Sequence, residues 1–193
     1  MSQQNENAEK ILQVGIHLMA NKGYQATSTR EIVEAAGVTK PMLYYYFGSK
    51  EGLCKAGIRR FSEQFFLKLR EKIDDPHDPR ESLVDYIWTI FSFMQEHRDE
   101  SLFYMSLFFG PERQWFLDDI KAVLADGKEL TIFFIEKLIR AGILRPGCEE
   151  EFSRTLHGMI DVWRWASITE GIVLSRSLAE RIVDNLLNGF GVR

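Results

Sequence analysis

The 193-residue chain has few cysteines and no long apolar run, and both features narrow its class. Cys54 and Cys148 are its two cysteines, and they lie far apart without a C-x-x-C motif or a second cluster of metal ligands. A disulfide framework and a zinc site are therefore not expected. No run of about 18 apolar residues occurs, and the polar N-terminus lacks the apolar segment of a signal peptide. We expect a cytoplasmic protein that does not enter a membrane.

Strand signals and catalytic motifs are also missing. No hairpin dipeptide separates alternating apolar runs, because Asp126-Gly127 falls within a long helical pattern. No nucleophile motif or phosphate-binding glycine loop occurs. His157 and Asp161 have the spacing of an acid–base pair on a helix, but Arg164 gives Asp161 an ordinary ion-pair partner. The sequence predicts an all-α protein that is not an enzyme, with no cofactor, no metal site and no catalytic residues.

Charge is distributed unevenly along the chain, whose net charge is −4. Residues 1–60 carry 8 Lys and Arg against 5 Asp and Glu, a net charge of +3, and the remainder carries −7. The pattern indicates a basic head on an acidic body. An excess of three charges is small, so it gains meaning only from the motifs that lie in the same region.

Two short helices joined by a tight turn are predicted between residues 28 and 47. Ser28 followed by Glu31 forms a capping box, and Gly37 ends the first helix. Thr39 caps the second helix, whose first turn tolerates Pro41 because that turn has no intrahelical partner for the missing N–H group. This arrangement is typical of a helix-turn-helix motif.

Three consecutive tyrosines, Tyr44, Tyr45 and Tyr46, occupy the second of these helices and cannot all face one core. With Leu43 and Phe47 inward, Tyr46 joins the edge of the core while Tyr44 and Tyr45 face outward. A phenol can pack on a thymine methyl group and hydrogen-bond to a phosphate or a base edge. We therefore predict that this outward face contacts DNA, and the alternative is a contact with protein or with a neighbouring helix.

Longer helices flank the motif. A first helix is expected over residues 7–22, and a long one from Lys50 to about Ile73 is followed by a polar, proline-containing break at residues 74–82. The N-terminus of the long helix, with Lys50 beside its free N–H groups, suits a phosphate. We expect a helix-turn-helix DNA-binding domain at residues 1–49 and a helical ligand-binding and dimerisation domain at residues 50–193.

At these positions the sequence resembles the tetracycline-repressor (TetR-type) family of bacterial transcriptional regulators. The matching residues have the spacing of the family's N-terminal motif, and they are Thr29, Ile32, Val33, Ala36, Gly37, Val38, Thr39, Leu43, Tyr44, Tyr46, Phe47, Ser49, Lys50 and Leu53. The resemblance implies a three-helix head joined by a continuous helix to a helical body, with residues 40–46 as the recognition helix.

The predicted DNA-binding residues lie in and around these helices: Ser28, Thr29, Arg30, Thr39, Lys40, Pro41, Met42, Tyr44, Tyr45 and Lys50. Pro41 occupies a position where the family usually has a small residue, so base contacts around it are expected to differ.

Bulky rings concentrate in the body on both sides of Gly110-Pro111, as an apolar cavity between helices would require. The predicted pocket residues are Trp88, Phe91, Met94, Phe103, Phe108, Trp115, Phe134 and Trp163. A solid core is the alternative. The resemblance implies a small ligand, whose identity the sequence does not give.

The helix expected over residues 149–170 is apolar on two faces, with Trp163 and Trp165 about 200° apart. Such a helix needs cover on both sides, which a second subunit can provide together with the last helix. The predicted dimer-interface residues are Gly158, Trp165, Ile168, Ile182, Leu186 and Phe190. A monomer in which both faces are core is the alternative.

The sequence thus predicts a DNA-binding transcriptional regulator, a homodimeric repressor on a pseudo-palindromic double-stranded operator. A small, largely apolar or aromatic effector would release it. The alternative is a DNA-binding factor whose body binds a protein partner instead of a metabolite.

Overall fold

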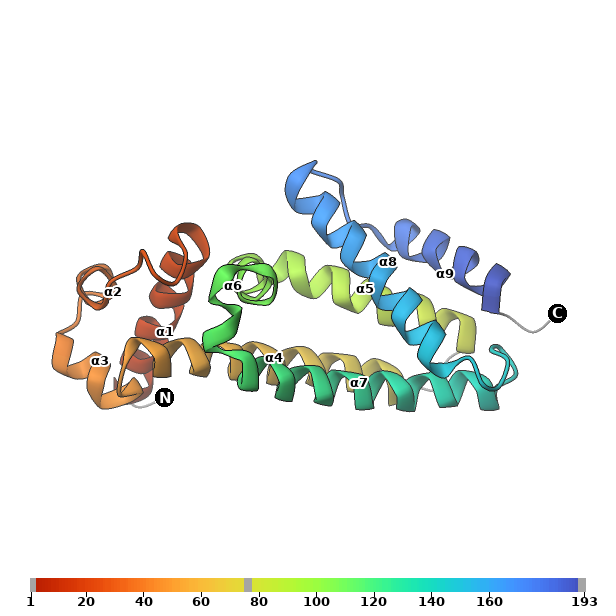
Figure 1. Cartoon of the computed structure of the whole chain (residues 1–193), viewed down its shortest axis with the longest axis horizontal. Coiled ribbons are helices and arrows are strands. Elements are labelled where there is room, and N and C mark those ends of the chain that lie inside the picture. The colour runs from red at the N-terminus through yellow and green to blue at the C-terminus, as the bar shows by residue number, and fades with distance from the viewer. Residues whose placement is uncertain (1–2, 75–77, 191–193) are drawn as a thin grey trace. The chain divides into compact units, whose positions relative to one another are not determined.

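The computed structural model describes residues 3–74 and 78–190, and the regular elements in these ranges are helices (Figure 1). They are α1 (Gln3–Lys22), α2 (Thr29–Ala36), α3 (Lys40–Phe47), α4 (Lys50–Asp74), α5 (Pro79–Glu96), α6 (Arg98–Phe109), the 3₁₀ helix η1 (Pro111–Trp115), α7 (Leu117–Arg140), α8 (Glu149–Thr169) and α9 (Arg176–Phe190). The prediction of an all-α fold is confirmed. Within the described ranges, no helix is both long enough and apolar enough to cross a membrane.

The chain forms two compact units, each built from two separate segments. Unit 1 comprises Met1–Gln64 and His97–Leu124, and unit 2 comprises Phe65–Glu96 and Ala125–Arg193. α4 and α7 are continuous helices that contribute residues to both units. The predicted functional boundary between residues 49 and 50 differs from these compact units and stays a prediction.

The core of unit 1 combines the first helices with residues from much later in the chain. Its fully or almost fully buried members are Ile11, Ile16, Met19, Ile32, Ala36, Leu43, Leu53, Cys54, Ile58, Phe103, Leu107, Phe116 and Ile120. α1 and α4 approach so closely that a Cβ atom on Gly57 would lie 2.3 Å from Cδ1 of Ile16. The helix-turn-helix region is therefore supported from both sequence segments of the unit.

The helix boundaries differ from the sequence predictions at two places. α1 begins at Gln3 rather than at residue 7, and Glu6 in its first turn interacts favourably with the helix dipole. α4 ends at Asp74, residues 75–77 of the predicted break lie outside the described residues, and α5 begins at Pro79. Proline is tolerated in a first turn because the N–H group that it lacks has no intrahelical partner there.

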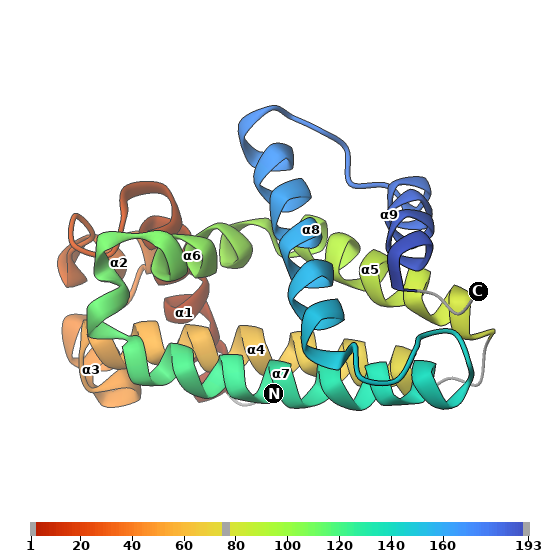
Figure 2. The same cartoon turned by 45° about the vertical axis from the view of Figure 1, so that its right-hand side comes forward.

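Unit 2 has a second core, formed by α5, α8 and α9 with the last residues of α4 and most of α7. The rings of Tyr86 and Phe134 stack with centroids 5.0 Å apart, and the Tyr86 hydroxyl hydrogen-bonds to Thr131 at 3.0 Å. Burial raises the pKa of Tyr86 to about 12. Figure 2 shows α8 and α9 joined by an extended connection. Arg176 of α9 pairs with Asp85 of α5 at 2.6 Å.

Candidate nucleic-acid interface

The start of α2 is fixed by side chains. Oγ of Ser28 accepts the N–H of Glu31 at 3.1 Å, and the Glu31 carboxylate accepts the N–H of Ser28 at 2.9 Å. The predicted capping box is present. Lys22 donates to Glu31 at 2.7 Å, and this bond, together with the Ser28 bonds, lowers the pKa of Glu31 to about 2. The carboxylate therefore stays charged and holds the first turn of α2.

The turn between α2 and α3 has the geometry that the sequence predicts. Gly37 has φ +64°, a left-handed conformation that a residue with a Cβ atom adopts only with strain. Val38 closes the helix end by donating to the carbonyl of Val33 at 3.0 Å. Thr39 precedes α3 with extended backbone, but its side chain makes no cap hydrogen bond. Its hydroxyl therefore does not have the capping role that the sequence predicts.

The three tyrosines divide between core and surface. Leu43 is fully buried, and Tyr46 is partly buried against the core of unit 1. Tyr44 and Tyr45 are 44% and 75% exposed. Met42, which we expected to face outward, is partly buried against the same core because Tyr46 lies one turn away on the same side of the helix.

The outer face of α3 is defined here as Thr39, Lys40, Pro41, Tyr44 and Tyr45, all exposed. Nζ of Lys40 lies 5.8 Å from the centroid of the Tyr44 ring, within cation–π range. No acidic residue occurs in α3. The face thus offers a cation, two phenols and a free threonine hydroxyl without a carboxylate that would repel phosphate.

Three further predicted DNA-binding residues lie at the start of α2, and each has a different environment. Ser28 is occupied by the capping box, and Thr29 is partly buried. Nε of Arg30 donates to Glu34 at 2.7 Å, while the side chain stays largely exposed. A guanidinium has five N–H donors, so this bond leaves others available.

Lys50 differs most from expectation. Its Nζ donates to the carbonyl oxygens of Tyr24 and Thr27, at 2.8 and 2.9 Å, and lies 4.2 Å from the centroid of the Tyr24 ring. Burial lowers the pKa of this ammonium group. The sequence alone does not indicate Tyr24 and Thr27 as partners of Lys50, because they lie 26 and 23 residues away.

The predicted pocket residues are divided between the two units. Phe103, Phe108 and Trp115 belong to unit 1, where Trp115 is 44% exposed and its ring centroid lies 6.0 Å from that of Tyr24. The others belong to unit 2, and they are Trp88, Phe91, Met94, Phe134 and Trp163. Those five lie in the buried core of unit 2 or in contact with its side chains.

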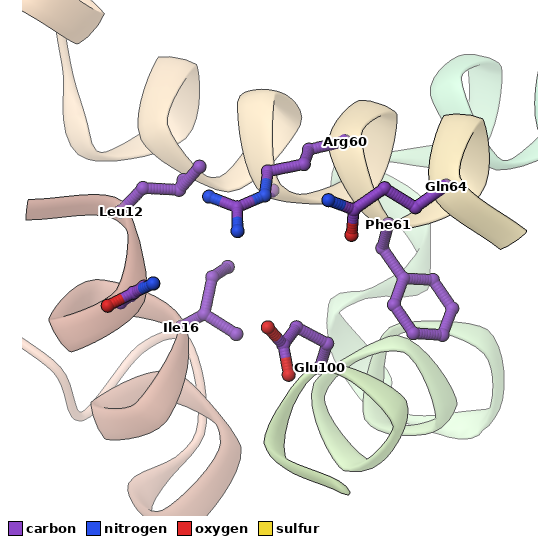
Figure 3. A pocket seen from close by; sticks show the side chains of 8 residues that line it. Leu12, Ile16, Arg60, Phe61, Gln64 and Glu100 are labelled. Carbon is purple, nitrogen blue, oxygen red and sulfur yellow. The ribbon is translucent and has the colours of Figure 1, made fainter. Parts of the chain in front are cut away.

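A small hollow, partly open to solvent, lies in unit 1 among α1, α4 and α6 (Figure 3). Its lining residues are Leu12, Gln13, Ile16, Gly57, Arg60, Phe61, Gln64 and Glu100, none of which we predicted for the pocket. Arg60 at its rim is already paired with Glu9. The polar rim and small size do not suit a large apolar ligand.

The predicted dimer-interface residues are also of two kinds. Gly158, Trp165 and Ile168 are exposed, whereas Ile182 and Leu186 are 1% and 2% exposed in the core of unit 2. The last two therefore stabilise this chain rather than present a surface. Phe190 ends α9, and its side chain lies outside the described residues. Two exposed residues are absent from the predicted interface, Val162 at 67% and Val173 at 73%, although Val162 lies one turn before Trp165.

The described residues contain no group of three or more His, Cys, Asp or Glu placed to hold a metal ion. His157 and Asp161 each bond to another group. His157 bonds to the carbonyl of Ser153 at 2.9 Å, and Arg164 bonds to Asp161 at 3.0 Å, as the spacing predicts.

Comparisons with known proteins give the same assignment for the N-terminal region. Residues 11–56 match the family model described as bacterial regulatory proteins, tetR family. The HTH-type transcriptional repressor KstR2 of Mycobacterium tuberculosis is 28% identical over 102 residues, which are 53% of this chain and 51% of KstR2. The chain thus spans about half the length of this relative.

Two longer matches each cover 95% of the chain. The uncharacterized HTH-type transcriptional regulator YdgC of Bacillus subtilis is 26% identical over 192 residues, 95% of this chain and 92% of YdgC. The structure of the fatty acid degradation regulator FadR from Bacillus halodurans aligns with a TM-score of 0.78, 19% identity and coverage of 95% of each chain. At that identity the likeness shows the fold alone. The resemblance predicted from the sequence is confirmed by the match of residues 11–56 to the tetR family of bacterial regulatory proteins.

Proposed function

We propose that this chain is a sequence-specific transcriptional repressor that binds operator DNA through α2 and α3. The observation that carries the proposal is the outer face of α3, where Lys40, Tyr44 and Tyr45 are exposed and no acidic residue occurs. A short helix kept only for structure has no reason to expose two adjacent phenols. In a major groove, Tyr45 would meet base edges and Lys40 would meet phosphate.

The names of the relatives support this function. KstR2 is a transcriptional repressor and YdgC a transcriptional regulator, and both are of HTH type. A repressor of this kind acts in the cytoplasm, where a bacterium keeps its DNA, and it requires no catalytic residues.

Selection from a library of random duplexes tests the DNA-binding function, because it does not depend on a known operator. The protein is expected to enrich one pseudo-palindromic sequence, and binding to it is then measured by fluorescence anisotropy. Enrichment of no sequence above the starting library would contradict the proposal. A sequence without two-fold symmetry would contradict the homodimeric mode of binding.

We further infer that the effector is small and largely apolar and that it binds in unit 2. The aromatic side chains in or against the core of that unit support this class, and they include Trp88, Phe91, Phe134 and Trp163. FadR, whose fold the chain shares, is named as a regulator of fatty acid degradation. Fatty acids are therefore the first compounds to test.

Reciprocal binding provides the test of the effector. A typical coupling would lower operator affinity about 5- to 150-fold, and operator DNA must weaken effector binding by the same factor. Effector binding is followed by tryptophan fluorescence, with and without the selected duplex. Equal affinity in both titrations would mean that the compound does not control DNA binding. A body that binds a protein partner would then be the better proposal.

A further inference from the structure

The ammonium group of Lys50 ties the start of α4 to the segment that connects α1 with α2. It donates to the carbonyls of Tyr24 and Thr27, two acceptors outside any helix. Buried or partly buried carbonyl groups need a donor, and a charged donor makes a stronger hydrogen bond than a neutral one. Both carbonyl groups lie outside the helices, so Lys50 supplies hydrogen bonds that helix formation does not provide to them.

The same segment is fixed by two further contacts. Thr27 is almost fully buried, and its Oγ1 donates to the carbonyl of Gly23 at 2.9 Å. The Tyr24 ring lies edge-on to Phe116, with centroids 5.0 Å apart, and under the ammonium group of Lys50. These contacts and the two Lys50 bonds together hold the segment in the conformation that the structure shows.

The segment matters because it leads directly into α2. Thr27 precedes Ser28, the N-cap of α2, whose first residues belong to the proposed DNA-binding set. If the carbonyl of Thr27 shifts, the capping box and the first turn of α2 shift with it. A change at Lys50 therefore reaches the DNA-binding residues through the backbone.

We propose that Lys50 is a positioning residue, which holds the start of α2 in its DNA-binding geometry and stays on the two carbonyls in the DNA complex instead of bonding to phosphate. This inference rests on the proposed DNA-binding function. The ammonium group has three N–H donors, of which two bond to the carbonyls while the Tyr24 ring centroid lies 4.2 Å from the nitrogen. A phosphate contact would therefore compete with these interactions, and an acceptor left unpaired is unfavourable.

Salt dependence distinguishes the two roles. Loss of one phosphate contact makes the plot of log affinity against log salt concentration shallower by about 0.9. Loss of a positioning contact lowers affinity without changing the slope. The variant Lys50→Met removes the charge and keeps an apolar stem, and Lys40→Met makes the same change on the outer face of α3. Binding to a fluorescent mixed-sequence duplex long enough for two half-sites is measured by anisotropy at several salt concentrations.

We expect Lys50→Met to lower affinity about tenfold with an unchanged slope, the size expected for a lost charge-assisted hydrogen bond. Lys40→Met should make the slope shallower. In the DNA-free protein, amide hydrogen exchange at Glu31 and Ile32 should become faster in Lys50→Met and stay unchanged in Lys40→Met. Circular dichroism at the binding temperature establishes that each variant is folded. If Lys50→Met does not fold, Lys50→Gln replaces it, because the amide keeps N–H donors without the charge.

A slope that is shallower by about 1.8 in the Lys50 variant, about 0.9 for the lost contact of each subunit of the dimer, with unchanged exchange at Glu31 and Ile32, would overturn the proposal and make Lys50 a phosphate ligand. Unchanged affinity with faster exchange would also overturn it, since Lys50 would then stabilise the fold alone. The unmodified protein tests the DNA-binding function separately. If that protein has no salt-dependent affinity for the duplex, the proposed DNA-binding function itself is wrong.

Discussion

Among the exposed residues of α3, removal of the Tyr45 side chain is predicted to have the clearest effect on DNA selectivity. It is 75% exposed, so its removal should not change the midpoint of thermal unfolding. Tyr45→Ala is expected to cost about 1–3 kcal/mol of binding free energy and to reduce preference at particular bases. Tyr45→Phe keeps the ring and removes the hydroxyl, and its loss measures the hydrogen bond alone. Anisotropy with the selected duplex and with single-base variants provides the measurement. Unchanged affinity and selectivity in Tyr45→Ala would exclude Tyr45 as a base-reading residue.

His157 should make the stability of the protein depend on pH. Burial lowers the pKa of its imidazole, whereas the unfolded chain keeps a value of about 6.5. The unfolded state therefore binds more protons around that pH, and the free energy of unfolding decreases as the pH falls below it. Urea midpoints measured from slightly alkaline to mildly acidic pH should decrease in the unmodified protein and decrease less in His157→Gln. Equal decreases in both proteins would contradict this origin.

At the scale of elements, the first turn of α4 requires glycine at position 52, because a larger residue has no room there. A Cβ atom on Gly52 would lie 2.0 Å from the carbonyl oxygen of Phe47, which is backbone and cannot rotate away. Gly52→Ala is therefore expected to cost about 3 kcal/mol or more. Urea denaturation of the purified variant measures the loss.

Gly189 provides the matched control, since a Cβ atom there would meet nothing within 4 Å. Gly189→Ala should be neutral or stabilise the protein by up to about 1 kcal/mol, because alanine favours the helix. Similar losses in both variants would mean that the contact with Phe47 does not determine the effect.

The sequence predicts the elements of this region well, because their signals are local. The capping box of Ser28 and Glu31 and the left-handed Gly37 involve residues within a few positions of one another. The inward Leu43 and outward Tyr45 follow from helix periodicity alone. These features therefore follow from short stretches of sequence, without any tertiary contact.

Contacts between distant segments could not be predicted in the same way. The Lys50 bonds join residues more than 20 positions apart, and helix periodicity places Ile182 on an apolar face without saying what covers that face. Composition groups the aromatic residues of the predicted pocket together, because it does not distinguish the core of unit 1 from that of unit 2. In each case the missing information was which element packs on which.

At the scale of the whole molecule, we predict a homodimer formed through an apolar surface of unit 2. Val162, Trp165, Ile168 and Val173 are each at least 41% exposed, which is unfavourable in water for a group of this size. Light scattering should give about twice the chain mass of 22.4 kDa. Trp165→Glu should shift the protein towards the monomer and weaken binding to the two-fold operator.

Phe133 provides a control for this substitution, since it is 46% exposed on α7 and does not belong to that surface. Phe133→Glu introduces the same charge and should leave the mass of the dimer unchanged. In the dimer, the two α3 helices are expected to contact half-sites about one helical turn, roughly 34–36 Å, apart. A monomeric unmodified protein, or the loss of the dimer in Phe133→Glu as well, would contradict the interface.

The two-segment construction of unit 1 has a consequence for recombination between related genes. The tetR-family match covers residues 11–56, yet Phe103, Leu107, Phe116 and Ile120 complete the hydrophobic core on which those residues pack. A crossover that transplants only the first 64 codons onto another regulator would give a hybrid whose inherited core meets foreign side chains. We therefore expect the proposed operator specificity to be exchanged intact only when codons 97–124 travel with the N-terminal segment, so these two stretches should be inherited together.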